Sequence, residues 1–175
     1  HSNPNIPSIQ PLEQLANLKT LILAYVPVSE DLAVLENMPD LEYLNLRNTG
    51  LTDIAPLADL DNLEYLNLHS NPAIQSIQPI RNLKQLQHLI LRDVPARNET
   101  AAIEPLPNLR SLNIRNCQIA DISFLGRMMQ RGILQNNPNR AYTARVDIRD
   151  NPITAGEQDA YESIRDFWGN IADRQ

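Results

Sequence analysis

The fold follows from one stretch of the chain, Leu60-Asp61-Asn62-Leu63-Glu64-Tyr65-Leu66-Asn67-Leu68-His69-Ser70-Asn71. Its apolar positions follow the pattern L-x-x-L-x-x-L-x-L-x-x-N. The end of this pattern recurs, in whole or in part, at 23–26, 46–49, 91–94, 114–117 and 148–151. The first five copies follow one another at nearly equal steps of about 22 residues, and a fixed period in this range predicts a solenoid, in which each repeat packs only against its neighbours.

Each repeat can be assigned residue by residue, and the unit that starts at Leu41 shows how. The leucines at 41, 44 and 46 are expected to point into the core, because the segment Tyr43–Arg47 alternates with period two, as a β-strand does. The apolar residues at 51, 54 and 57 are expected to bury the opposite side. This arrangement is typical of leucine-rich repeats and predicts one strand per repeat, about six in all.

The last position of the pattern has a structural role, because the chain turns away from the strand there. An Asn side chain at this point can hydrogen-bond the backbone groups that the turn leaves free. Asn71 and Asn151 suit this role, and Thr49 and Cys117 can act as smaller substitutes. Valine stands at this position in two units, at 26 and 94, and each valine is followed by proline. Those two units are therefore expected to turn differently.

A longer period lies above the short one and equals three short steps. His1-Ser2-Asn3-Pro4 recurs at 69–72, the stretch at 8–11 recurs at 76–79, and the stretch at 21–23 recurs at 89–91. Three repeats therefore form one larger unit. The stretch at 1–12 corresponds to the part of a repeat that follows its strand. We therefore expect a truncated first repeat, in a domain excised from a longer protein with at least one more repeat upstream.

The last repeat departs from the short period. The step from Ile114 to Ile148 is about half as long again as the others, which indicates an insertion at 124–144. A helix is expected at Phe124–Arg131, and Gly132 is suited to end it. The repeat domain therefore spans 1–153. Residues 154–175 are expected to form a helical cap, because the last repeat of a solenoid has no neighbour to cover its core.

Composition excludes several classes of function. The 175 residues carry a formal net charge of −6, whereas a general nucleic-acid binder needs a basic surface, so no nucleic-acid partner is expected. The single cysteine, Cys117, excludes an intramolecular disulfide. Apolar runs fall short of the roughly 18–20 residues that span a membrane, so membrane insertion is not expected.

The repeats resemble the 22-residue class of leucine-rich repeats found in bacterial internalins and in a eukaryotic regulator of protein phosphatase 1. The resemblance rests on Leu60, Leu63, Leu66 and Leu68 and on the unit ends at 51–57 and 76–80. It covers about residues 1–125 and 145–153. It implies an α/β fold, namely a right-handed solenoid with parallel strands on the concave face and 3₁₀ or irregular segments on the convex side. It also implies a protein-binding role in a bacterial protein at the cell surface or secreted, with a cytoplasmic location left open.

Side chains on the exposed side of the strands form columns, since neighbouring strands lie about 4.8 Å apart. The first column reads Thr20, Tyr43, Tyr65, His88, Ser111 and Arg145. The second reads Ile22, Asn45, Asn67, Ile90, Asn113 and Asp147. The third reads Ala24, Arg47, His69, Arg92, Arg115 and Arg149. The fourth, nearer the turn, reads Tyr25, Asn48, Ser70, Asp93, Asn116 and Asp150.

The third column is the strongest functional signal, because four arginines and a histidine line up on an acidic protein and like charges repel. One interpretation is a solvated face on which Asp93, Asp147 and Asp150 are local partners. The other, which we favour, is a binding surface for an acidic partner anchored by Arg and Tyr, residue types enriched where binding energy concentrates. The candidate partner-binding residues are Tyr43, Asn45, Arg47, Tyr65, Asn67, His69, His88, Arg92, Asn113, Arg115, Arg145, Asp147 and Arg149.

Catalysis is not expected. His69 and His88 lie in the third and first columns, which are about 13 Å apart along the strands, too far to share a metal ion. Cys117 sits at a turn position, where a structural role is the simpler interpretation. The sequence therefore predicts a non-enzymatic protein- or peptide-binding module without cofactor, whose oligomeric state stays open. The alternatives are a structural spacer with its binding site elsewhere, and a carbohydrate-binding surface built on the Tyr and Asn columns.

Overall fold

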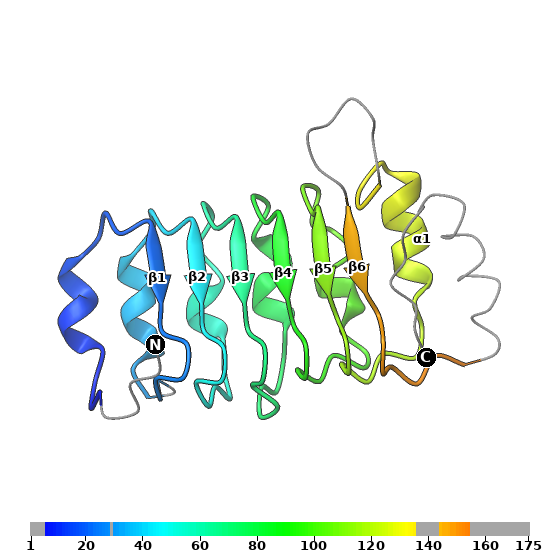
Figure 1. Cartoon of the computed structure of the whole chain (residues 1–175). Helices are drawn as coiled ribbons and strands as arrows, with labels where there is room; N and C mark the ends of the chain where they lie inside the picture. The colour runs from blue at the N-terminus through cyan, green and yellow to red at the C-terminus, as the bar shows by residue number, and fades with distance from the viewer. Residues whose placement is uncertain (1–5, 29, 136–143, 155–175) are drawn as a thin grey trace.

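The computed structural model describes residues 6–28, 30–135 and 144–154. Each repeat contributes one strand to a parallel sheet of six strands in chain order (Figure 1). The strands are β1 (Thr20–Ile22), β2 (Tyr43–Asn45), β3 (Tyr65–Asn67), β4 (His88–Ile90), β5 (Ser111–Asn113) and β6 (Arg145–Asp147). The solenoid and its parallel sheet are confirmed.

Short helical segments run behind the sheet, one before β1 and the others between successive strands (Figure 1). Among the described residues, five are 3₁₀ helices: η1 (Gln10–Gln14), η2 (Leu32–Asn37), η3 (Ala55–Leu57), η4 (Gln78–Asn82) and η5 (Thr100–Ala102). The sixth is the α-helix α1 (Ser123–Gln130), which lies between β5 and β6. Buried leucine, isoleucine and valine side chains from every repeat fill the space between the sheet and these segments as one continuous core.

The register of the sheet confirms the first and second columns. Thr20 pairs with Tyr43, Tyr43 with Tyr65, and the same pattern continues to Arg145 on β6. Each strand is three residues long, shorter than the predicted Tyr43–Arg47. Backbone bonds nevertheless continue past the strand, for example from Asn48 N–H to the carbonyl of His69 at 2.9 Å. Third-column residues therefore lie just beyond the strand ends.

Asn71 has the role that the sequence predicts. Its amide donates to the carbonyls of Leu46 and Leu68 at 2.8 and 2.9 Å, and its oxygen accepts from the N–H groups of Thr49 and Leu51 at 3.0 and 3.2 Å. The side chain therefore ties two neighbouring turns together. Asn151 has the same role near the C-terminal end of the solenoid, where its oxygen accepts from the N–H groups at 117 and 119.

The two valine units turn by a different hydrogen bond. Where the next repeat supplies no Asn, the N–H of Val26 bonds to the carbonyl of Leu23 at 2.9 Å, and Val94 bonds to Leu91 at 2.8 Å. The positive φ of the residue before each valine is the same as in the other units. The predicted difference therefore lies in the hydrogen bonds and not in the direction of the chain.

Every fourth-column residue has a positive φ, between 52° and 64°. This left-handed conformation is uncommon except for Gly, Asn and Asp. Asn or Asp stands there in four of the six repeats, and Ser70 in a fifth. The exception is Tyr25 with φ 64°.

Carboxylates join neighbouring repeats on the side opposite the strands. Asp31 accepts the N–H of Ile9 at 2.9 Å, and Glu99 accepts the N–H of Ile77 at 2.5 Å. Both pairs lie at the start of a 3₁₀ helix, where backbone N–H groups lack partners. Hydrogen bonds from Ser8 and Ile9 lower the pKa of Asp31. The second pair lies one triple unit after the first, so the triple unit repeats these contacts as well.

The C-terminal region agrees with the sequence where it is described. Helix α1 begins one residue earlier than predicted, and Gly132, with φ 80°, follows it. The predicted cap at 154–175 lies outside the described residues beyond 154, as does most of the loop in the insertion. Within the described ranges, each helix is too short or too polar to cross a membrane.

Candidate functional site

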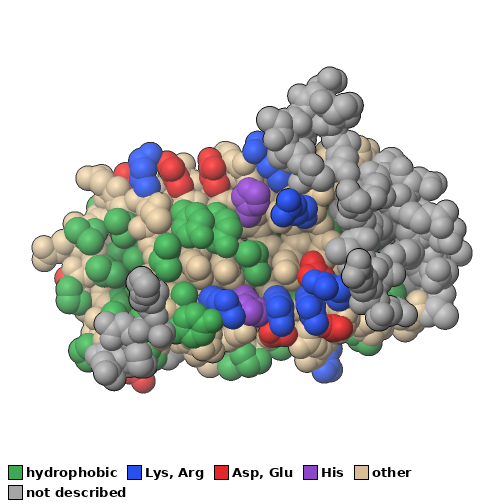
Figure 2. Space-filling model, in the orientation of Figure 1, with side chains coloured by type: hydrophobic (Ala, Val, Ile, Leu, Met, Phe, Trp, Pro, Cys, Tyr) green, Lys and Arg blue, Asp and Glu red, His purple; other side chains and the backbone are tan. Residues whose placement is uncertain are grey.

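The outward side of the sheet is called here the strand face, and it comprises the four columns. Its N-terminal half lies over β1, β2 and β3, and its C-terminal half over β4, β5 and β6. Figure 2 shows hydrophobic side chains gathered over the N-terminal half, whereas basic and acidic side chains lie together along one edge of the C-terminal half. The two halves therefore offer different chemistry to a partner.

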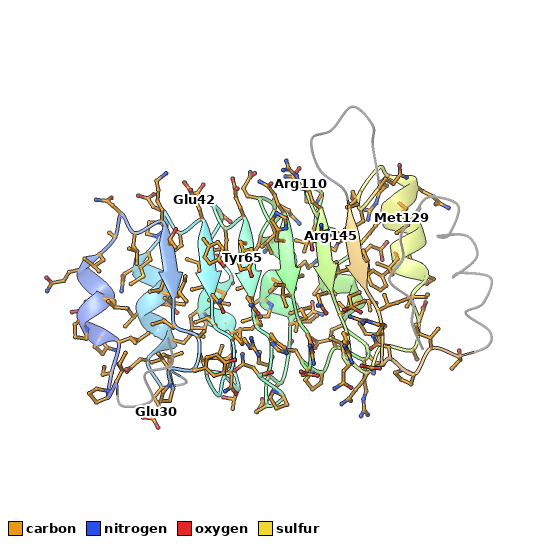
Figure 3. The ribbon with its side chains drawn as sticks, viewed as in Figure 1. Glu30, Glu42, Tyr65, Arg110, Met129 and Arg145 are labelled. Atoms are coloured by element: carbon orange, nitrogen blue, oxygen red, sulfur yellow. The ribbon has the colours of Figure 1, made fainter. Side chains whose placement is uncertain are left out.

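An aromatic stack occupies the middle of the N-terminal half. The rings of Tyr43 and Tyr65 lie 4.1 Å apart and are nearly parallel, with 6° between their planes. Strand pairing places these residues directly beside each other, because Tyr43 on β2 is in register with Tyr65 on β3. Tyr65 is labelled in Figure 3. His88 continues the row at 6.1 Å in a tilted orientation. Burial, with a hydrogen bond to Tyr43, raises the pKa of Tyr65 to about 12, so its hydroxyl stays neutral.

Two exposed apolar residues belong to the β1 repeat, Ile22 two positions and Tyr25 five positions along the chain from Thr20, which pairs with Tyr43. Ile22 is 58% exposed and occupies the second column, where four other repeats carry Asn or Asp. Tyr25 is 37% exposed, and its ring lies under the guanidinium of Arg47 at 5.2 Å. Both residues belong to the first described repeat. With the half-buried tyrosine stack they make the N-terminal half the more apolar part of the strand face (Figure 2).

The polar residues of the second column have a local structural role. In Asn45, Asn67, Asn113 and Asp147 the side-chain oxygen accepts the backbone N–H two residues later, at 2.9–3.2 Å. This contact closes the end of each strand and uses one acceptor of the side chain. The sequence assigned these four residues to partner binding. In the structure their first contact is with their own repeat.

The basic column of the C-terminal half is bound to acids of this chain. Arg115 Nε lies 2.5 Å from Asp150, and Arg149 makes two contacts with Asp147, at 2.8 and 2.7 Å. Burial raises the pKa of Asp147, but hydrogen bonds from Arg149 outweigh it, so the net pKa is lowered. The sequence named these acids as local partners of the arginines, and the structure brings them together.

The junction of the two halves is arranged differently. His69 is buried at the end of β3, and its Nε2 lies 3.2 Å from Asp93. Burial lowers the pKa of His69, and the charges of Arg47 and Arg92 lower it further, against an opposing effect of Asp93. Both guanidiniums therefore act on one imidazole.

The opposite edge of the strand face, in the C-terminal half, carries the candidate residues Arg145 and His88 of the first column. Figure 3 shows Arg145 at the start of β6 and Arg110 before β5. Arg145 is exposed. Burial lowers the pKa of His88, as does the charge of Arg110, while Glu64 opposes the shift. Arg145 and His88 thus stand apart from the junction around His69.

Metal binding and nucleophilic catalysis find no support among the residues described. The His, Cys, Asp and Glu side chains of these ranges do not gather into a group of three that could hold a metal ion. Cys117 is buried, and its thiol donates to the carbonyl of Leu91 at 3.1 Å. Burial raises its pKa to about 12, so the reactive thiolate is not formed at neutral pH.

Sequence reasoning missed two residues of the exposed surface, Ile22 and Tyr25. A signal was available in the columns. Ile22 is apolar where most repeats are polar, and Tyr25 is aromatic where the others carry residues suited to a left-handed turn. Departures from a local rule are expected at functional sites.

Comparison with known proteins identifies the same repeat architecture. The family model "Leucine Rich repeats (2 copies)" matches residues 39–82, and "Leucine Rich Repeat" matches 108–128. The chain is a leucine-rich repeat protein. Leucine-rich repeats are generally protein-interaction modules, and internalin-like folds are typically scaffolds without enzymatic activity.

Solved structures of bacterial proteins resemble this leucine-rich repeat protein. An internalin from Listeria monocytogenes has 31% sequence identity and a TM-score of 0.65, with 69% of this chain and 35% of that chain covered. Internalin C2 from the same organism has 28% identity and a TM-score of 0.66, with 83% and 58% covered. The chain thus spans between about a third and three fifths of these relatives. It is an internalin-like repeat protein.

One further structure shares the fold only. A leucine-rich repeat protein of Leptospira interrogans has 18% identity and a TM-score of 0.65, with 95% of this chain and 51% of that chain covered. The comparison with curated proteins gave no match.

Proposed function

We propose that this leucine-rich repeat protein is a non-enzymatic module that binds a protein or peptide on its strand face, chiefly over the N-terminal half. The observation that carries the proposal is the surface of the exposed Ile22 and Tyr25 and the half-buried Tyr43 and Tyr65. A partner that covers apolar side chains gains free energy by removing them from water. Tyrosine is also enriched among the residues that dominate binding energy.

Tyr25 adds a separate argument. A non-glycine residue in the left-handed conformation costs about 1–2 kcal/mol relative to an ordinary one, unless its side chain is suited to it. Asn and Asp are suited, and the other repeats use them or Ser. Tyrosine at φ 64° makes folding less favourable and leaves its ring 37% exposed. Contact with a partner gives this residue a role that folding does not.

The surface favours a protein partner over the two alternatives. A structural spacer gains nothing from exposed Ile22 and Tyr25, since most other repeats carry polar residues at the same positions. A carbohydrate would need open ring faces, yet Tyr43 and Tyr65 use one face each on the other ring. The remaining face of Tyr65 is directed towards the tilted ring of His88. Apolar side chains of a peptide can pack against the ring edges of Tyr43 and Tyr65, which the stack leaves open.

A location at the cell surface or outside the cell forms part of this proposal. Fractionation of the bacterial source, with detection of the repeats in each fraction, tests the location. Recovery in the cytoplasm would contradict it.

The binding proposal can be tested with selected peptides. A displayed library of random peptides is panned against the protein, and an enriched peptide is synthesised for calorimetry. We expect Ile22→Ser and Tyr43→Ser each to weaken its binding about tenfold, because each removes apolar contact area. The matched control is Leu15→Ser, since Leu15 is 46% exposed but follows η1, outside the four columns.

Two results would contradict the proposal. The first is a selection in which no peptide is enriched. The second is an enriched peptide that binds Ile22→Ser and Tyr43→Ser as tightly as the parent. Circular dichroism of each variant establishes that the repeats remain folded.

A further inference from the structure

We infer that Arg47, His69 and Arg92 form a subsite for a carboxylate of the partner, beside the aromatic surface. This inference rests on the proposed function and deepens it. It means that the bound segment carries an acidic side chain close to an apolar or aromatic one. The subsite lies at the junction of the two halves, on the ends of β2, β3 and β4.

The first support is a deficit of negative charge at the junction. Arg115 and Arg149 each have a carboxylate of their own. At the junction, Asp93 is the acid next to His69 and Arg92, at 3.2 and 3.5 Å, and it also accepts from the amide of Asn116. Arg47 forms no ion pair within the described residues; its described contact is the ring of Tyr25. The two arginines of the junction, Arg47 and Arg92, therefore have one acid near them, Asp93, and it lies beside Arg92.

The second support is a pair of donors without acceptors. The Nε atoms of Arg47 and Arg92 are buried and, within the described part of the chain, make no hydrogen bond. Arg92 Nε lies 3.5 Å from Asp93, close enough for attraction between charges but without the geometry of a hydrogen bond. A buried donor without an acceptor is unfavourable, because it has lost its hydrogen bonds to water and gained none in return. A carboxylate matches the fork of a guanidinium and can accept from Nε and Nη together.

The third support is the convergence of the two arginines on His69. Arg47 and Arg92 flank His69 in the third column, one on each neighbouring strand. In agreement with this placement, both guanidiniums lower the pKa of its imidazole. Their backbones are two strand spacings apart, about 10 Å, which flexible Arg side chains can bridge. An anion placed over the ring would contact Arg47 from one side and Arg92 from the other. Tyr25 under Arg47 connects this place to the apolar surface.

The test is a double-mutant cycle between the protein and the peptide selected above. Replacing the acidic residue of the peptide by its amide is expected to weaken binding to the parent about tenfold, the usual effect of a charge-assisted hydrogen bond. Against Arg47→Gln or Arg92→Gln, the same change in the peptide is expected to have less than about a threefold effect, because the guanidinium is already absent.

The matched control is Arg81→Gln, which removes the same charge from an exposed residue of η4 behind the sheet. Against this variant the change in the peptide should keep its tenfold effect. Arg47→Lys keeps the charge and loses the fork, so we expect an intermediate affinity. Thermal unfolding identifies any variant that fails to fold. If a Gln variant does not fold, the same cycle with Arg47→Lys tests the subsite.

The outcomes separate the subsite from the function. If enriched peptides lack acidic residues, or if the tenfold effect persists against both arginine variants, the subsite is wrong while binding to the strand face stands. If Ile22→Ser and Tyr43→Ser leave the affinity unchanged, the proposed function itself is wrong.

Discussion

The N-terminal and C-terminal halves of the strand face are built by the same repeat and present different surfaces. The N-terminal half exposes Ile22, Tyr25 and the stack of Tyr43 on Tyr65, whereas in the C-terminal half Arg115 and Arg149 pair with acids of the chain. The inward leucines are buried in both halves. The core therefore does not dictate the difference, which lies in the outward side chains alone.

The largest expected effect concerns the turns beneath the two halves. Asn71→Ala should lower the free energy of unfolding by about 3 kcal/mol, because a fully buried amide loses its four hydrogen bonds to backbone groups. Asn151 makes equivalent bonds but is only partly buried, so water can replace some of them and Asn151→Ala should have a smaller effect. Urea unfolding measures both variants. Equal losses would contradict this asymmetry between the halves.

The next effect concerns the aromatic stack. A double-mutant cycle with Tyr43→Ala and Tyr65→Ala should give a coupling energy of about 1 kcal/mol in urea unfolding, the usual value for an aromatic pair. The matched cycle pairs Tyr43 with His88, which is two strands away and should be additive within about 0.5 kcal/mol. Similar couplings in both cycles would mean that the stack is not a separate contact.

Sequence alone placed these residues in their columns, because the short repeat and the period-two strand fix which positions are neighbours. Tyr43 beside Tyr65 and Arg47 beside His69 follow from counting. The buried role of Asn71 follows as well, since a turn leaves backbone groups that an amide can satisfy. The repeat period thus predicts backbone position reliably.

Side-chain partners could not be predicted in the same way. Arg149 bonds to Asp147 in its own repeat, whereas Arg115 bonds to Asp150 in the next one, although both arginines occupy the same column. The choice depends on rotamers and on small differences in distance, which the period does not determine. For the same reason the sequence could not show that Asn45 turns its oxygen back to its own repeat.

A smaller effect tests whether the N-terminal half gives up stability for its surface. Tyr25→Asn should raise the free energy of unfolding by about 0.5 kcal/mol, because relief of the left-handed tyrosine exceeds the loss of its contact with Arg47. Binding of the selected peptide should weaken at the same time. The reverse change, Asn48→Tyr in the same turn of the next repeat, should destabilise. A Tyr25→Asn protein that is less stable than the parent would indicate a structural role for Tyr25.

The smallest effect concerns His69, at the junction of the two halves. Burial and the charges of Arg47 and Arg92 lower its pKa below the ordinary value of 6.5, so the folded chain favours the neutral ring. The unfolded chain therefore takes up its proton first as the pH falls. The contribution of His69 to the free energy of unfolding is fully present above about pH 6.5. It is lost as the pH falls through that value towards the lower pKa of the folded state.

Histidine NMR titration measures the pKa of His69 directly. We expect Arg47→Gln and Arg92→Gln each to raise it, Arg81→Gln to leave it unchanged, and bound acidic peptide to raise it. A pKa of His69 above 6.5 in the free protein would mean that Asp93 outweighs both arginines, and the junction would then not lack negative charge.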